Sequence, residues 1–151
     1  MKNFYLFFTL YIFFAIPNYF FFTDFSQHIQ LIFPNFFLSN KLIGLSLAIN
    51  YGLIALAATI IYKEKKLENV TFWGSLFTCL VLNTAYLVLP FKSVDLFLIF
   101  IECFLLAVST WVLIIFSRKI KKTSFFLLLP YGIWTTLSTF FTYAIYLLGS
   151  N

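Results

Sequence analysis

Charged residues are scarce in this chain of 151 residues, where Asp, Glu, Lys and Arg together make up 10% of the sequence. A soluble domain usually contains about 25% charged residues. Here hydrophobic residues reach 62% and the mean hydropathy is +0.97. This composition excludes a soluble globular enzyme. The length instead suits about five membrane spans, because each span needs about 20 apolar residues.

Histidine and cysteine are also nearly absent. His28 is the only histidine, which excludes a bis-histidine haem, a histidine-rich metal site and nearly every mechanism that depends on histidine. The two cysteines, Cys79 and Cys103, both lie within apolar runs. They are predicted to be buried thiols rather than a disulfide or a metal site. With no Ser/His/Asp set and no phosphate-binding loop, the sequence does not favour an enzyme, and no catalytic residue is predicted.

Five apolar runs predict the fold, and they cover residues 4–22, 42–62, 70–89, 94–116 and 124–148. Each is long enough to cross about 30 Å of hydrocarbon at about 1.5 Å per residue. A backbone exposed to lipid satisfies its polar groups only in helices or closed barrels, and the runs lack the alternating polarity of a barrel. We therefore predict an all-α integral membrane bundle of five transmembrane helices, forming one domain over residues 1–151. The first run is too long for the apolar part of a signal peptide, so we expect it to be retained.

The net charge of +5 comes from short basic clusters between the runs. Position 2 and the segments 63–66 and 118–122 place eight basic residues on one side of the membrane, against Lys41 and Lys92 on the other. The positive-inside rule therefore predicts a cytoplasmic N-terminus and an external C-terminus. Because the clusters flank the spans, they indicate orientation and not binding to nucleic acid. The longest connector, about residues 23–41, is then external and could fold over the end of the bundle.

Small residues recur at a spacing of four in two of the runs. Gly44, Ala48 and Gly52 form one such stripe, and the pairs Gly74–Thr78 and Ser75–Cys79 repeat the pattern. This spacing lets helices approach closely in a membrane. A packing seam within the chain is the favoured interpretation, and a homodimer is the other.

Polar residues inside the spans supply candidate site residues. Glu102 is the ninth residue of its run, where a carboxylate costs about 3 kcal/mol or more and should face the bundle or a cavity. Two interpretations stay open: a ligand contact or proton site, or a neutral Glu hydrogen-bonded to a neighbouring helix. In the last run, Trp134, Ser138 and Thr142 are spaced by four, with Tyr131 three residues before Trp134. This stripe is predicted to face the interior.

The segment LPYGIW at 129–134, followed by Ser138, resembles the last helix of the TspO/MBR family, the tryptophan-rich sensory or translocator proteins, where the pattern is VPY-x-x-W. The segment LNTAY at 82–86 is similar to the family's L-N-x-A-W, and Glu102 falls where the family commonly has Asp. Residues 50–64, which begin Asn-Tyr and end Tyr-Lys-Glu, are similar to the family's second helix, which ends Trp-Lys-Glu. The chain departs from the family in having only 3 Trp.

The resemblance implies a divergent bacterial binding protein for porphyrins, related tetrapyrroles or other rigid hydrophobic ligands, acting in their transport, sensing or turnover. Aromatic faces would stack on the ligand and a few polar groups would orient it. No axial haem ligand is evident, so no cofactor is predicted, and photochemical porphyrin breakdown is the only enzymatic activity that the resemblance allows. The alternative is a structural or regulatory membrane subunit without a small-molecule ligand. The ligand-binding residues expected are Tyr51, Asn83, Tyr86, Glu102, Trp134 and Ser138.

Overall fold

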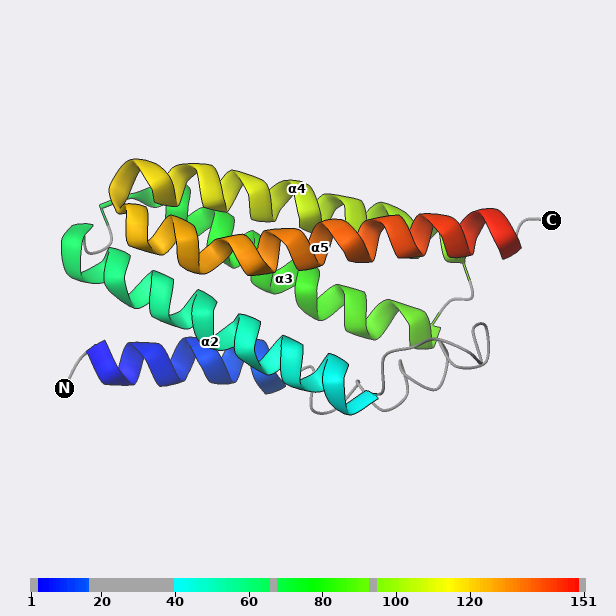
Figure 1. The fold of residues 1–151 in the computed structure, drawn as a ribbon, viewed down its shortest axis with the longest axis horizontal. Coiled ribbons are helices and arrows are strands. Elements are labelled where there is room, and N and C mark those ends of the chain that lie inside the picture. Colours follow the sequence, from blue (N-terminus) through cyan, green and yellow to red (C-terminus); the bar gives the residue numbers. More distant parts are fainter. Residues whose placement is uncertain (1–2, 17–39, 66–67, 93–94, 150–151) are drawn as a thin grey trace.

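A computed structural model describes residues 3–16, 40–65, 68–92 and 95–149, and at residues 40–41, 65 and 86–92 it describes the backbone alone. Every regular element in this part of the chain is a helix, which confirms the predicted all-α class. The helices are Asn3–Ile16, α2 (Asn40–Lys65), α3 (Val70–Lys92), α4 (Leu96–Ile120) and α5 (Lys122–Gly149), as Figure 1 shows.

Three of these helices are long and apolar enough to cross a membrane over the residues described. They contain the segments Leu42–Glu64, Leu96–Ile120 and Lys122–Leu148. Asn3–Ile16 and Val70–Ala85 are apolar as well, but they are shorter over the residues for which the structure gives side chains. The end of the first predicted run and the connector at 23–39 lie outside the described residues.

The helices form a bundle whose members lie roughly along one long axis (Figure 1). The most extensive contact is between α4 and α5, which are joined by Lys121 alone; α3 packs against α4 and α2 against α5. The first helix lies beside α2, where the Phe14 ring stacks on Tyr51 with centroids 5.5 Å apart. This order brings side chains from all the described helices toward one interior.

The helix ends differ from the predicted run ends for identifiable reasons. The predicted fourth run, 94–116, includes position 95, but Asp95 is the exposed N-cap of α4. Its Oδ1 accepts hydrogen bonds from the amides of Phe97 and Leu98 at 3.0 and 3.4 Å, as expected for Asp at this position. The predicted third run ends at residue 89, yet α3 continues through Pro90 to Lys92. Pro90 has no backbone N–H to donate to the preceding turn, and α3 ends two residues later.

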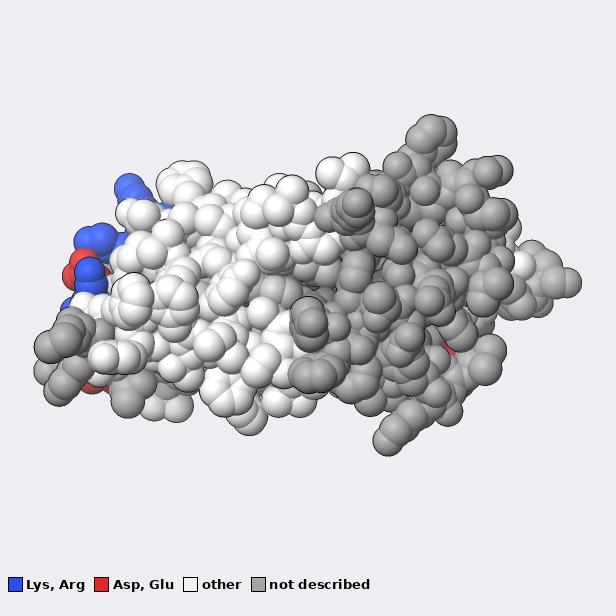
Figure 2. Space-filling view, turned by 90° about the horizontal axis from the view of Figure 1, so that it is seen from below, with Lys and Arg blue, Asp and Glu red and all other residues white. Residues whose placement is uncertain are grey.

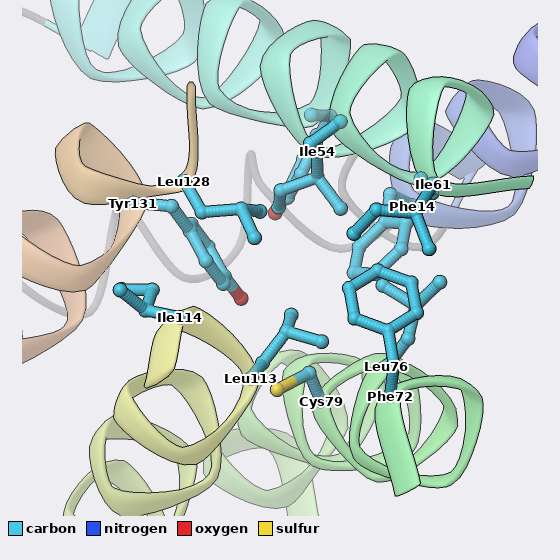
Figure 3. Close-up of a cluster of buried hydrophobic side chains, with 13 residues drawn as sticks. Phe14, Ile54, Ile61, Phe72, Leu76, Cys79, Leu113, Ile114, Leu128 and Tyr131 are labelled. Carbon is cyan, nitrogen blue, oxygen red and sulfur yellow. The ribbon is translucent and has the colours of Figure 1, made fainter. Parts of the chain in front are cut away.

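Side chains from several helices meet in a buried hydrophobic cluster (Figure 3). Both cysteines are buried thiols, as predicted, and Cys79 Sγ lies 3.8 Å from Thr110 Oγ1. The outer faces carry large exposed apolar side chains such as Phe77 and Phe140, as expected for surfaces in contact with lipid. The cluster consists of Phe14, Tyr51, Ile54, Ala57, Ala58, Ile61, Phe72, Leu76, Cys79, Leu113, Ile114, Leu128 and Tyr131.

The predicted small-residue seams behave differently on the two helices. Gly44, Ala48 and Gly52 of α2 are half-buried, and a Cβ at Gly52 would lie 4.0 Å from the Tyr11 ring of the first helix. Gly74 and Thr78 of α3 are both exposed, and a Cβ at Gly74 would meet nothing within 4 Å. The packing interpretation therefore fits α2. On α3 the pair Gly74–Thr78 does not face another described helix, whereas Cys79 of the pair Ser75–Cys79 is buried against Thr110 of α4.

Candidate ligand site in the bundle interior

Three polar side chains from three helices converge inside the bundle. The Tyr51 hydroxyl of α2 donates to Asn83 Oδ1 of α3 at 3.2 Å, and the Tyr131 hydroxyl of α5 donates to the same oxygen at 3.4 Å. Their exposed fractions are 2%, 4% and 1% for Tyr51, Asn83 and Tyr131. Figure 3 shows the Tyr131 side chain reaching from α5 into the buried cluster. Asn83 therefore links α2, α3 and α5 through one carbonyl oxygen.

Four buried polar atoms of the bundle are not satisfied by the described part of the protein. Asn83 Nδ2, Asn50 Oδ1 and both carboxyl oxygens of Glu102 are buried and have no hydrogen-bond partner there. Buried polar groups in proteins are paired in the large majority of cases, and leaving one unpaired costs about 1–3 kcal/mol. Asn83 Nδ2 can therefore donate a hydrogen bond to a bound molecule or to water, and the three oxygens can accept one from either.

Glu102 lies on the buried face of α4 and is 5% exposed. The next residue, Cys103, accepts a 3.1 Å hydrogen bond at its carbonyl from Thr139 Oγ1 of α5, so this turn of α4 is packed against α5. The predicted burial of Glu102 is therefore correct. The structural interpretation required a hydrogen bond to a neighbouring helix, and no such partner exists among the described residues.

The predicted polar stripe of α5 is buried only in part. Tyr131 and Thr142 are buried, whereas Trp134 and Ser138 are half-buried. The Thr142 hydroxyl donates to the Ser138 carbonyl at 3.1 Å, a bond within α5 itself. Trp134 and Ser138 are therefore less buried than Tyr131 and Thr142, the other members of the predicted stripe.

Among the predicted ligand-binding residues, Tyr51 and Asn83 are the pair that the structure joins directly. Tyr86 lies on α3, one turn beyond Asn83, but its side chain is outside the described part. Sequence reasoning did not include Tyr131 or Asn50 in the site. Tyr131 belonged to the predicted interior stripe, but nothing in the sequence indicated that it meets Tyr51 at a shared acceptor.

A close contact between α4 and α5 positions the α5 side of the site. A Cβ on Gly132 would lie 2.5 Å from Ile114 Cδ1 and 3.6 Å from the Trp111 ring, so glycine permits the approach of the two helices. Trp111 Nε1 donates to Thr136 Oγ1 of α5 at 3.0 Å. These contacts set the position of Tyr131, which directly precedes Gly132.

The described residues contain no group of three or more His, Cys, Asp or Glu that could hold a metal ion. Within the described residues, the interior contains aromatic faces, the amides of Asn50 and Asn83, the carboxyl of Glu102 and apolar walls. This fold and this interior define a helical membrane protein with a polar cluster buried between its helices.

Comparison with known proteins gives the family. The model of the TspO/MBR family matches residues 6–148, and the chain belongs to this family. It is 36% identical over 104 residues to the tryptophan-rich protein TspO of Bacillus cereus, covering 69% of this chain and 68% of that protein. It is 32% identical over 136 residues to the uncharacterized membrane protein YtaB of Bacillus subtilis strain 168, covering 89% and 88%. Together with the apolar helices, membership establishes an integral membrane protein.

Proposed function

We propose that the protein binds a rigid hydrophobic ligand, a porphyrin or related tetrapyrrole, within its helical bundle and takes part in the transport, sensing or turnover of that ligand. The observation that carries the proposal is the set of buried polar atoms without a partner around Asn83 and Glu102. Membership in the TspO/MBR family supports the same interpretation. A purely structural bundle has no use for such atoms, because each one lowers its stability.

The chemistry of the interior matches a flat, mostly apolar molecule with a few polar groups. Tyr51 and the half-buried Trp134 provide aromatic faces for stacking. Asn83 Nδ2 is a donor, while the Glu102 carboxyl and Asn50 Oδ1 are acceptors. A tetrapyrrole presents both acceptors and N–H donors within a rigid plane, so it can satisfy these groups with little loss of its own conformational freedom.

The direct test is a titration of the purified protein with protoporphyrin IX, following porphyrin absorbance and Trp fluorescence. Saturable binding supports the proposal. Partitioning that rises linearly, without saturation, would favour the alternative of a structural or regulatory subunit.

Trp134 gives a sharper version of this experiment. Trp134→Ala should weaken porphyrin affinity by about 1–3 kcal/mol, the range measured for bases stacked on aromatic side chains, and Trp134→Phe should cost less because a ring face is kept. Trp111→Phe is the control, since Trp111 is an exposed residue of α4 that bonds to Thr136, and Phe keeps a ring beside Gly132. Equal losses from changes at both tryptophans, or no loss from either, would mean that the ligand does not lie against α5.

We propose further that the N-terminus is cytoplasmic and the C-terminus external. Figure 2 shows the described Lys and Arg side chains gathered at one end of the molecule. At this end α2 finishes, α4 finishes and α5 begins, and basic residues favour the cytoplasmic side. A reporter fused to the C-terminus should be active only outside the cytoplasm. Activity inside would contradict the orientation.

A further inference from the structure

The corner between α4 and α5 concentrates positive charge at one end of the bundle. Arg118 and Lys119 lie in the last turn of α4, Lys121 is the single residue between the helices, and Lys122 is the first residue of α5. Arg118, Lys119 and Lys122 are exposed. We refer to Arg118, Lys119 and Lys122 together as the basic corner.

Contacts with aromatic rings hold two of these cations close to the ends of the helices. The Arg118 guanidinium carbon lies 5.6 Å from the ring centroid of Phe125 on α5, and Lys119 Nζ lies 5.1 Å from the ring centroid of Phe116. Both distances are within the range of a cation–π contact. The cationic groups are therefore restrained beside the apolar part of the bundle, at the level where a membrane meets water.

The charge of the basic corner is not neutralised by the described protein. Glu64, at the end of α2, pairs with Lys121. Arg118, Lys119 and Lys122 form no ion pair with any residue that the structure describes. Lys63, next to Glu64 near the end of α2, is exposed and adds a further positive charge close to the Glu64–Lys121 pair.

We propose that the basic corner binds the headgroups of anionic phospholipids in the adjoining leaflet. The position at the ends of two spanning helices brings the cations to the depth of lipid phosphates. A planar guanidinium such as Arg118 can bind phosphate through two parallel hydrogen bonds, and the lysines attract it as point charges. Orientation by the positive-inside rule requires only a count of charges, whereas this site predicts saturable binding that depends on particular residues.

The test uses the full chain purified in a nonionic detergent and titrated with dioleoylphosphatidylglycerol or dioleoylphosphatidylcholine, with bound lipid counted by native mass spectrometry. The anionic lipid should bind saturably and at least about tenfold more tightly than the zwitterionic one. Lys119→Gln/Lys122→Gln should weaken binding of the anionic lipid about tenfold to thirtyfold, since each basic residue near an anionic surface contributes attraction. The matched control is Lys41→Gln/Lys92→Gln, which removes the same charge elsewhere and should change the affinity less than twofold.

Two further measurements test whether positive charge at these two positions is sufficient and whether a soluble anion can replace the lipid. Lys119→Arg/Lys122→Arg, which keeps the charge, should retain the affinity, and inorganic phosphate in large excess should not displace the lipid. The proposal is overturned if both lipids bind equally, if the two Gln double variants lose affinity equally, or if inorganic phosphate competes. Porphyrin titration of the Lys119→Gln/Lys122→Gln variant should give unchanged affinity, so the lipid site and the proposed function fail or succeed separately.

Discussion

Replacing Asn83 tests whether the convergence of three helices on one side chain stabilises the bundle. Asn83→Leu keeps a side chain of similar size but removes the oxygen that accepts from Tyr51 and Tyr131. Hydrogen bonds between helices in membranes average about 0.6 kcal/mol and reach about 1.7 kcal/mol, while a hydroxyl left buried without an acceptor costs about 1–3 kcal/mol. We expect Asn83→Leu to lower the free energy of unfolding by about 1–3 kcal/mol.

The two tyrosines should contribute unequally. The bond from Tyr51 is 3.2 Å long and that from Tyr131 is 3.4 Å, so Tyr51→Phe should destabilise the wild-type protein more than Tyr131→Phe. In the Asn83→Leu background, either change to Phe should cost less than it does in the wild-type protein, because the hydrogen bond to Asn83 Oδ1 is already lost. The double-mutant cycle for Tyr51 and Asn83 should therefore give a coupling of about 0.5–1.5 kcal/mol.

The measurement is unfolding of the detergent-solubilised protein by increasing mole fractions of sodium dodecyl sulfate, followed by intrinsic Trp fluorescence. Thr84→Val is the control on the same helix, because the Thr84 hydroxyl donates only to Leu80 O of its own helix at 2.9 Å. This change should stay within about 0.5 kcal/mol. A coupling of zero between Tyr51 and Asn83, or equal losses for Asn83→Leu and Thr84→Val, would refute the reasoning.

Two other predictions follow from the interior. Glu102→Gln should fold normally, because the amide keeps the shape and adds a donor, while Glu102→Lys should destabilise the protein by about 3 kcal/mol or more. Unfolding curves of both variants check these stabilities. The porphyrin affinity of the Gln variant shows whether the carboxyl itself contacts the ligand. Gly132→Ala should destabilise by about 1–3 kcal/mol through overpacking against Ile114, and adding Ile114→Val should recover part of the loss. Gly74→Ala is its control, since open space surrounds that position and Ala is the better helix former; a loss at Gly74 equal to that at Gly132 would contradict the packing argument.

The helices of this protein were predictable because a backbone in lipid has no water with which to form hydrogen bonds. A long apolar run must satisfy its own amides and carbonyls, so the class followed from composition and run length alone. The ends of the helices were less predictable, since they depend on local chemistry. Asp95 caps α4 instead of lying within it, and Pro90 lies inside α3 instead of ending it.

The sequence allowed the burial of single site residues to be predicted, but not the hydrogen bonds that join them. The burial of Glu102 followed from the cost of placing a carboxyl in lipid. The meeting of Tyr51, Asn83 and Tyr131 did not follow, because the two hydrogen bonds join residues 32 and 48 positions apart. Such a contact requires the order of the helices and the rotation of each about its axis. A repeat within one helix reports which residues share a face, but not which face of another helix they meet.

Most polar side chains that join the helices have their partners, and this separates the packing chemistry from the candidate site. Ser124 donates to the Ala57 carbonyl at 3.1 Å, Thr139 to the Cys103 carbonyl at 3.1 Å and Trp111 to Thr136 at 3.0 Å. These bonds hold α5 against α2 and α4 and use the donors that each side chain offers. The unsatisfied atoms are instead confined, within the described residues, to Asn50, Asn83 and Glu102. The same bundle satisfies its other buried donors consistently, so these three residues are the exceptions on which the proposal of a bound ligand rests.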